Sequence, residues 1–525
     1  MTGNMTDRLA ALDGRDFDLV VVGGGAAGAA ATQNLAAKGF RTLLVEQGDF
    51  ASGTSSRSSR LLYCGLSYFS PDYPLWKAIL NPRDMMRRVK TVRQAMRCRT
   101  ELASTAPERV KPYDFVFPVK KRSDYPRWKV ALGYRALSLF GSAKVPLAYR
   151  HDPMPGAARE GLVSFMDPAE LVGVARFREY QYDWPERICM DAVMDAERLG
   201  ATVANYTRVA GFRREGQDWC LTLENGPLPG RPAAPANRRA EIRARFLVNT
   251  AGAWVDRLLK QGPGSHPRHV IGEKGINLVV RLPDACRGQG METISSTGEP
   301  FYLMPWGEYH FFGPTHSVFD GPPEDVRVLP EEIDHVLAEA NRVFPDFRLT
   351  RDDVVYSWAG VRPRTSNASA GLLRVFTIHD LAREGLDNAI AVTGVPIMVH
   401  RHAGRSVAAW VAERLAPTGQ PGRLDPGARL LPVDDGPAIG GVPVASLRAA
   451  ARREHVLCLP DLMFRRVNMG WQVDMGLPHA EAVARAVADI LGWDEDRIAA
   501  EVAAYRAFVI ANFDPAIARG GKAAA

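Results

Sequence analysis

The chain lacks the features that mark membrane-spanning, secreted and metal-binding proteins. No run of about 18 apolar residues occurs in the 525-residue sequence, so no transmembrane helix is predicted. The first sixteen residues have no apolar core before a cleavage site, and a secretory signal is not expected. Only six cysteines occur, none in a CxxC pair. They predict free thiols in a reducing compartment, and neither a metal site nor a redox dithiol.

The composition is that of a globular protein of several domains. Hydrophobic residues make up 46% and charged residues 24% of the chain, which excludes a disordered, collagen-like or disulfide-stapled protein. The 66 basic and 59 acidic residues leave a net charge of +7, an excess that fits an anionic ligand or an anionic membrane surface. No DNA- or RNA-binding motif accompanies the basic residues, so no nucleic acid partner is predicted.

Residues 17–46 have the order of a dinucleotide-binding unit. A buried strand is predicted over 17–22, an alanine-rich helix ends near Lys38, and a second strand covers 42–45. A glycine-rich turn stands between the first strand and the helix. Strand, turn, helix and strand in this order are typical of a βαβ unit that holds a pyrophosphate at the helix N-terminus.

The glycine-rich turn has GxGxxG spacing. Gly23 allows the tight turn, Gly25 lets the backbone approach a pyrophosphate, and Gly28 allows close packing of helix on strand. Glu46 ends the second strand and can accept hydrogen bonds from an adenosine ribose. Residues 54–60 then bring five hydroxyl residues and two arginines, which can bind phosphate oxygens and flavin edges. The predicted contacts of this region are Gly23, Gly25, Ala26, Ala27, Gly28, Glu46, Gln47, Thr54, Ser55, Ser56, Ser58 and Ser59.

These segments resemble the start of the FAD-dependent glycerol-3-phosphate dehydrogenase family, within the D-amino-acid-oxidase-like flavoproteins. Further resemblances follow in the family's order over 246–255, 304–315, 357–363 and 461–466. The resemblance covers nearly the whole chain and implies FAD as the cofactor. It also implies cofactor contacts at Val209, Ala251, Gly252, Trp254, Gly394, Pro396 and Ile397.

The resemblance implies an α/β fold. A Rossmann-like FAD-binding domain of the glutathione-reductase type is expected, with an antiparallel β-sheet substrate domain and a helical C-terminal domain. The oxidoreductase region is expected over 1–425, a linker over 426–445 and the helical domain over 446–525. The expected FAD-binding segments are 15–70, 165–268 and 386–416, and the expected substrate segments are 71–164 and 269–385.

Several local expectations follow from the sequence pattern. Residues 70–150 are expected to contain helices, and residues 169–200 one helix or two. A strand is expected over 201–205, and the loop 225–232 marks a β-hairpin insertion. In the C-terminal tail Asp494 is a predicted helix N-cap, ahead of four residues near helical spacing: Ile498, Val502, Tyr505 and Val509.

The sequence departs from the family where the family binds its substrate. Tyr63 and Asn277 stand at two family histidines, Ser67 at an arginine and Pro396 at a lysine. Loss of these groups removes most of the charge that complements a phosphate, so a less anionic or bulkier substrate is expected. The family's arginines are kept at two positions, Arg362 and Arg374.

The catalytic residues are predicted from what remains. Arg362 and Arg374 are expected to hold the substrate, and His316 or His400 to act as the base. Tyr63 is a further candidate base that would need a lowered pKa. Cys64 is either a residue that forms a flavin adduct or an inert thiol, and the sequence favours the inert thiol.

Three classes of function are open at this stage. The first is an FAD-dependent dehydrogenase that oxidises a secondary alcohol of a polyol, a polyol phosphate or a related hydroxy compound. The second is an FAD-dependent amine or amino-acid oxidase, and the third is a non-catalytic flavin-binding protein. A quinone or oxygen is the expected electron acceptor and a homodimer is one expected assembly. The expected location is the cytoplasm, with the basic segment 83–99 and the aromatic segment 128–140 as a contact to the inner face of the membrane.

Overall fold

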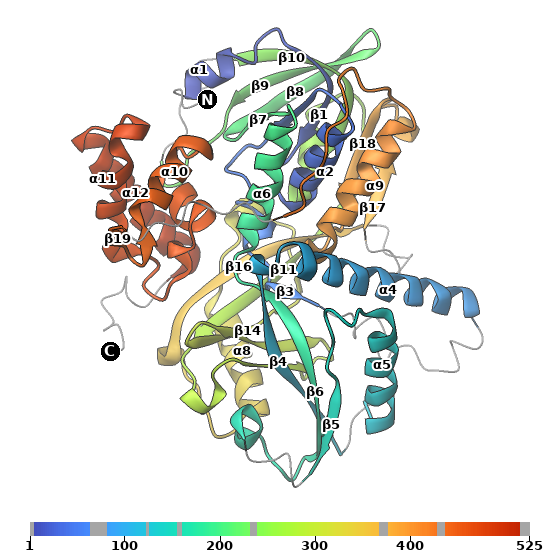
Figure 1. Ribbon diagram of the computed structural model, residues 1–525, viewed down its shortest axis with the longest axis vertical. Coiled ribbons are helices and arrows are strands. Elements are labelled where there is room, and N and C mark those ends of the chain that lie inside the picture. The colour runs from blue at the N-terminus through green and yellow to red at the C-terminus, as the bar shows by residue number, and fades with distance from the viewer. Residues whose placement is uncertain are drawn as a thin grey trace.

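The computed structural model describes residues 5–63, 81–121, 125–154, 160–231, 239–366, 376–427 and 436–514. Figure 1 shows three parts: two domains built on β-sheets, one above the other in this view, and a group of C-terminal helices beside them. None of the helices in these ranges combines the length and the apolarity that a bilayer crossing requires.

The upper domain contains an eight-stranded sheet whose centre is parallel. Five strands run parallel in the order β18, β10, β1, β2 and β7, and β17 lies antiparallel at the β18 edge. The strands are β1 (Asp16–Val22), β2 (Thr42–Val45), β7 (Thr202–Ala204), β8 (Thr207–Glu215), β9 (Asp218–Asn225), β10 (Arg239–Asn249), β17 (Thr377–Asp380) and β18 (Ala389–Thr393). The predicted strands over 17–22, 42–45 and 201–205 are confirmed, because these apolar runs are buried between helices on both faces.

Helices cover both faces of this sheet. One face is packed by three helices, and the other by two short helices and the β8–β9 hairpin. The helices are α2 (Ala26–Ala37), α6 (Pro185–Arg198) and α9 (His400–Ala412) on the first face, and α1 (Met5–Ala10) and α7 (Val255–Leu259) on the second. The helix predicted to end near Lys38 is confirmed.

The lower domain contains a ten-stranded, mostly antiparallel sheet. Its order is β15, β11, β14, β13, β12, β4, β6 and β3, with β16 paired to β11 and β5 paired to β6. The strands are β3 (Leu61–Leu62), β4 (Val110–Lys120), β5 (Arg150–Pro153), β6 (Leu171–Tyr182), β11 (Val270–Val280), β12 (Gln289–Ile294), β13 (Pro300–Trp306), β14 (Tyr309–Gly313), β15 (Ser317–Val318) and β16 (Val354–Thr365). The pair β12–β4 is parallel.

The two faces of this sheet have different partners. On the outer face, Leu278, Leu303 and Ala359 pack against α8 (Pro330–Val343). On the inner face, aromatic residues such as Phe115 and Trp358 pack against the other helices, which are α4 (Pro82–Thr105), α5 (Arg127–Phe140) and the C-terminal group. The inner face is therefore enclosed by three separate parts of the chain.

The structure corrects the expectation of helix after residue 169. Residues 171–182 form β6, because Val174, Phe177 and Tyr182 belong to a β-branched and aromatic run that pairs with β4 along its length. Only the second half of the segment is helical. β6 also joins the lower sheet, whereas the expected boundaries assign 165–268 to the FAD-binding domain.

The C-terminal residues form the predicted helical domain. Its helices are α10 (Val444–Arg453), α11 (Ala480–Leu491) and α12 (Glu495–Phe513), preceded by a small hairpin of β19 (Ala438–Ile439) and β20 (Val442–Pro443). The side chain of Asp494 accepts a hydrogen bond from the amide of Arg497, which confirms the predicted N-cap.

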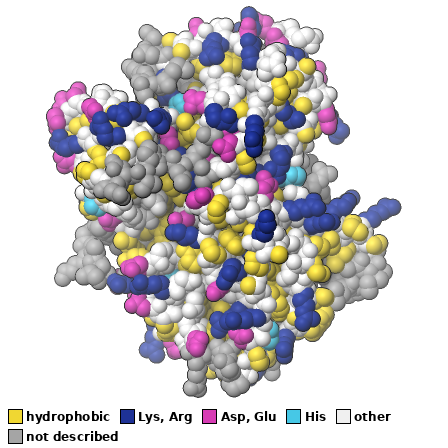
Figure 2. Space-filling view, in the orientation of Figure 1, with side chains coloured by type: hydrophobic (Ala, Val, Ile, Leu, Met, Phe, Trp, Pro, Cys, Tyr) yellow, Lys and Arg dark blue, Asp and Glu magenta, His cyan; other side chains and the backbone are white. Residues whose placement is uncertain are grey.

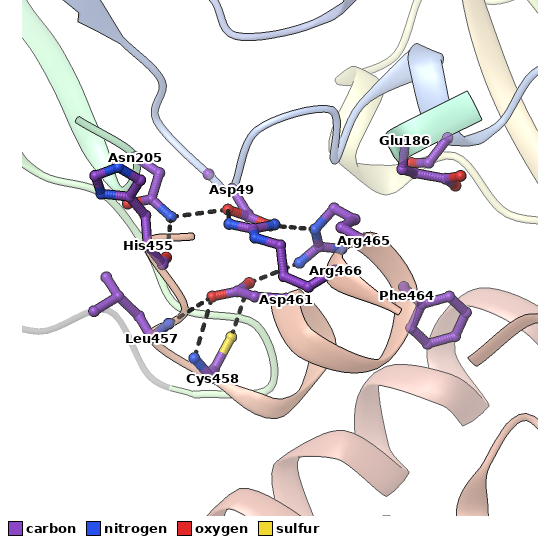
Figure 3. Close-up of polar contacts among 12 residues, drawn as sticks. Asp49, Glu186, Asn205, His455, Leu457, Cys458, Asp461, Phe464, Arg465 and Arg466 are labelled. Carbon is purple, nitrogen blue, oxygen red and sulfur yellow. Dashed lines mark hydrogen bonds and ion pairs between the residues drawn. The ribbon is translucent and has the colours of Figure 1, made fainter. Parts of the chain in front are cut away.

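A buried ion network fastens the helical domain to the upper domain (Figure 3). Asp49, which follows β2, accepts hydrogen bonds from Arg465 and from both terminal nitrogens of Arg466, at 2.6 and 2.7 Å for the latter. Arg465 also binds Asp461 at 2.7 Å. Removing one member would leave a buried charge uncompensated, so the network holds the two parts in one arrangement.

Candidate functional site

The glycine-rich turn lies between β1 and α2, and two of its glycines are required by space. Gly23 has a φ of +106°, and a Cβ built on it would lie 2.6 Å from the carbonyl oxygen of Thr250. A Cβ on Gly28 would lie 1.8 Å from the carbonyl oxygen of Gly23. Only glycine fits at either position. Gly23 therefore allows the tight turn and Gly28 the close packing of α2 on β1, as the sequence predicts.

The N-terminus of α2 forms a cradle for an anion. The amide of Ala26 donates to Ser55 Oγ at 2.9 Å, and a Cβ on Gly25 would lie 3.2 Å from the same oxygen. The amides of Ala27 and Gly28 belong to the first helical turn and have no acceptor within the helix. The amides of Ala27 and Gly28 are donors of the kind that bind a pyrophosphate, and the helix dipole favours negative charge here.

Glu46 closes the base of this cradle. Its carboxylate accepts hydrogen bonds from the amides of Gly24 at 2.7 Å and Gly48 at 2.9 Å. Burial raises the pKa of Glu46, although both hydrogen bonds act in the opposite direction. The side chain thus joins the glycine-rich turn to the loop after β2.

The hydroxyl residues of 54–60 divide into two groups. Thr54 Oγ1 donates to the carbonyl of Val361 at 2.7 Å, and Ser55 contacts α2 as described, so both link this loop to other segments. Ser56 Oγ donates to Gly53, and Ser58 Oγ accepts from the amide of Arg60, so these two hydroxyls stabilise the loop itself. No side-chain hydrogen bond within the described residues involves Ser59.

The other segments expected to hold FAD meet at the same place. A Cβ on Gly394 would lie 2.9 Å from Thr365 Oγ1 at the end of β16, and a Cβ on Gly53 would lie 3.2 Å from the ring of Trp254. Residues after β10 and residues of β16 therefore adjoin the 53–57 loop, and residues after β18 adjoin the end of β16. The expected contacts in these segments are Ala251, Gly252 and Trp254 after β10, and Gly394, Pro396 and Ile397 after β18. Val209 is buried in β8.

His316 lies in a cluster with Glu273 and two arginines. Its Nδ1 is 3.1 Å from Glu273 Oε1, while Arg362 Nη1 lies 3.3 Å from Oε2 and Arg364 Nη1 lies 3.6 Å from Oε1. Burial acts to raise the pKa of Glu273, but the bond from His316 and the charge of Arg362 outweigh it and lower the pKa. Glu273 is a carboxylate at neutral pH.

The tautomer of His316 follows from this contact. A carboxylate only accepts hydrogen bonds, so Nδ1 carries the hydrogen of the neutral ring and Nε2 carries a lone pair. His316 Nε2 is buried and has no hydrogen-bond partner among the described residues. An imidazole oriented by a carboxylate, with its second nitrogen free, is the arrangement of a general base.

His400 has a different environment. It is 2% exposed, and its Nδ1 lies 2.6 Å from the carbonyl oxygen of Ile397. Burial, followed by the charge of Arg401, lowers the pKa of His400 to about 4, so the ring is neutral at physiological pH. Arg374, Ser67 and Cys64 lie outside the described residues.

The inner face of the lower sheet carries two buried carboxyl groups that sequence reasoning missed. Tyr63 donates to Glu292 Oε1 at 3.0 Å, and Glu179 lies 3.5 Å from Arg99 Nε. Burial raises the pKa of Glu292 to about 8, the charge of Glu179 adds to the rise, and the Tyr63 hydrogen bond opposes it. The signal in the sequence is a glutamate in the strand Gln289–Ile294, at the alternate positions that face inward.

Two residues of the segment 274–277, which resembles a family motif, are buried. Lys274 is buried and pairs with Glu332 of α8 at 2.7 Å, so its charge is neutralised on the outer side. Asn277 is 1% exposed, and its Oδ1 has no hydrogen-bond partner within the described ranges. At the position where the resemblance implies a histidine, the chain therefore has a buried amide oxygen.

A parallel sheet with an anion cradle at the first helix, beside a second sheet that carries an oriented histidine, defines a flavoprotein oxidoreductase. The family of FAD-dependent oxidoreductases matches residues 18–416, and the chain belongs to this family. The protein is an FAD-dependent enzyme, as predicted. The cradle at α2 and the converging segments fit FAD, whose pyrophosphate they would hold.

Named relatives agree with the family resemblance. A glycerol-3-phosphate dehydrogenase of Synechocystis sp. is 28% identical over 77% of this chain and 71% of the relative. An alpha-glycerophosphate oxidase of Streptococcus pyogenes serotype M1 is 30% identical over 68% of this chain and 55% of the relative. The resemblance to the glycerol-3-phosphate dehydrogenase family is confirmed at this level.

Solved structures share the fold. The glycerol-3-phosphate dehydrogenase of Bacillus halodurans, complexed with FAD, superposes with a TM-score of 0.72 at 20% identity, over 97% of this chain and 98% of that one. A glycine oxidase of Geobacillus kaustophilus superposes with a TM-score of 0.55 at 21% identity, over 78% and 98%. The predicted combination of a parallel FAD-binding sheet, a substrate sheet and C-terminal helices is confirmed.

Proposed function

We propose that the protein oxidises a secondary alcohol of a hydroxy compound that carries no phosphate. The observation that supports this most directly is the His316–Glu273 pair with its free Nε2, next to Arg362 and to the end of β16. β16 adjoins the segments that would hold FAD. When bound, FAD supplies the acceptor for the hydride of the alcohol.

His316 and Arg362 have separate roles in this proposal. His316 Nε2 takes the hydroxyl proton as the carbon–hydrogen bond breaks, and Glu273 stabilises the imidazolium that results. Arg362 is 56% exposed in its side chain, so its guanidinium is accessible to a polar group of the substrate. Arg374 stays a second predicted anchor, and His400 stays a predicted alternative base.

The absence of phosphate in the proposed substrate follows from the charges around the inner face. Glu292 and Glu179 put two carboxyl groups on this face, where Arg99 pairs with Glu179, and Lys274 pairs with Glu332 on the opposite face. None of these groups offers a phosphate an unpaired cation, so placing a dianion here would carry an uncompensated cost of desolvation. The substrate is therefore expected to be neutral or cationic.

A second candidate is the oxidation of an amine. The buried Glu292 has a pKa of about 8, so above that pH its carboxylate could pair with the charge of an ammonium substrate. The shared fold with a glycine oxidase is compatible with this chemistry. Anaerobic reduction of the bound flavin by hydroxy compounds, amines and glycerol-3-phosphate separates these options.

We also propose a membrane contact through α4 and α5. Trp128, Leu132 and Leu139 are exposed at helical spacing on α5. Exposed cations follow α4 at similar spacing, at Lys90, Arg93 and Arg97. In Figure 2 hydrophobic and basic side chains lie together on the right side, where Figure 1 places these helices. Apolar anchors beside cations suit an anionic bilayer, where the enzyme would pass electrons to a quinone.

A further inference from the structure

A cavity of about 180 Å³ lies between the upper domain and the C-terminal helices. Its wall is mostly aromatic and apolar, with Phe464, Trp471, Phe508 and Phe513 from the C-terminal part and the loop 227–229 from the upper domain. A cavity of about 150 Å³ accommodates one benzene ring. The space therefore suits a ligand with a single ring or a short acyl chain.

The cavity is separate from the cradle that would hold FAD. The 52–57 loop stands between them: Thr54 and Ser55 point to β16 and α2, whereas Ser52, Ser56 and Arg57 line the cavity. Gly25, Glu46 and Trp254 do not line it. A molecule in the cavity would thus contact the opposite side of the loop.

Arg57 brings a positive charge to the wall of the cavity. Its guanidinium donates to Asn512 Oδ1 at 3.0 Å and lies 4.6 Å from the centre of the Phe513 ring, but it forms no ion pair with any described residue. The second arginine of the wall, Arg465, is neutralised by Asp49 and Asp461. Burial, followed by the charge of Arg465, lowers the pKa of Arg57 to about 9.

We propose that this cavity binds a small organic anion, with its carboxylate or phosphate group on Arg57 and its apolar body against the aromatic wall. The anion relieves the cost of a charge held in an apolar space, and charge-assisted hydrogen bonds to a guanidinium are strong and directional. Because both the 52–57 loop and α12 line the cavity, the anion joins the cofactor-side loop to the helical domain.

Equilibrium dialysis of radiolabelled benzoate against the FAD-loaded enzyme tests this site. Benzoate should bind at one saturable site, phenyl phosphate should displace it, and benzyl alcohol, which has a similar shape without charge, should not. Arg57→Gln should weaken binding at least tenfold. Arg213→Gln removes an arginine from an exposed pair with Glu241 and should leave binding unchanged.

Two further variants keep the test decisive. Leu228→Trp fills the cavity from the loop side with Arg57 intact, and it should also abolish benzoate binding even if Arg57→Gln disturbs the docking of α12. Arg362→Met alters the proposed substrate site and should leave benzoate binding in place. Binding that survives in both Arg57→Gln and Leu228→Trp, or that is lost in Arg362→Met, would overturn the proposal.

Discussion

Tyr63 donates a hydrogen bond to Glu292, with Oη and Oε1 3.0 Å apart, although 229 residues separate them in the chain. The pair places a carboxyl group with a raised pKa on the inner face of the substrate sheet. Its neighbours include Tyr302, whose ring meets that of Tyr63 edge to face. An acid and two phenols thus lie together on this face, near the Arg99–Glu179 pair.

The first prediction concerns the pH dependence of stability. The pKa of Glu292 is about 8 in the folded protein against 4.5 as its ordinary value, so the folded state binds more protons between these pH values. Its contribution to the free energy of unfolding is present below pH 4.5 and is lost as the pH rises to about 8. Glu292→Gln removes this contribution, which is worth on the order of a few kcal/mol. The free energy of unfolding of the variant, measured by urea unfolding at a series of pH values, should therefore change less with pH. If the free energy of unfolding changed with pH in the same way in both proteins between pH 4.5 and 8, Glu292 would not have the raised pKa.

The second prediction concerns the proposed base. His316→Gln should lower the rate of flavin reduction by roughly 10²–10⁴, because a positioned base contributes about that much. FAD content should not change. Glu273→Gln keeps the imidazole but weakens its orientation, so a smaller loss is expected. Stopped-flow measurement of flavin reduction by an active substrate gives both rates. If His316→Gln reduced its flavin as fast as the wild type, His316 could not be the base.

The third prediction concerns the junction of the three parts. Arg60 is fully buried, 3.9 Å from the centre of the Trp471 ring, and its ion-pair partner Glu186 lies at 3.4 Å. Glu186→Gln removes the negative charge and should destabilise the protein by about 3–5 kcal/mol, because the charge of Arg60 stays buried. Adding Arg60→Met should recover part of this loss. The shift in the unfolding midpoint of each variant measures its loss of stability. If the loss in the double variant equalled the sum of the losses in the two single variants, Arg60 and Glu186 would not be energetically coupled.

The fourth prediction concerns the α4–α5 surface. The triple variant Trp128→Ser, Leu132→Ser and Leu139→Ser should bind vesicles of phosphatidylglycerol and phosphatidylcholine at least tenfold more weakly in sedimentation assays, because it removes the exposed apolar anchors. Neutral phosphatidylcholine vesicles are the control for charge. Equal binding of wild type and variant to the anionic vesicles would rule out this surface.

The parts of the molecule that could be predicted have local signals. Gly23, Gly28 and the strands around them follow from spacing and apolar runs within about thirty residues, and the structure places them as expected. The Asp494 cap and α12 are local in the same sense. The helical expectation for 171–182 failed because pairing with β4, which lies about sixty residues earlier, decides that segment.

The parts that could not be predicted depend on distant pairings. Asp49 and Arg466 are 417 residues apart, and Tyr63 and Glu292 lie on different strands of a ten-stranded sheet. No local pattern states which strands become neighbours or which face they share. The family resemblance predicts which substrate positions are altered, whereas the carboxyl groups of the inner face became evident only once the strands were placed together.

The measurement that tests the central claim most directly is anaerobic bleaching of the bound flavin by a panel of compounds. The panel holds neutral polyols and hydroxy compounds, amines, and glycerol-3-phosphate, each mixed with the FAD-loaded enzyme without oxygen. The account predicts that a neutral or cationic compound reduces the flavin and that glycerol-3-phosphate reduces it slowly or not at all. Oxidation of glycerol-3-phosphate with a kcat/KM of about 10⁴ M⁻¹s⁻¹ or more, which is ordinary enzyme efficiency, would contradict it.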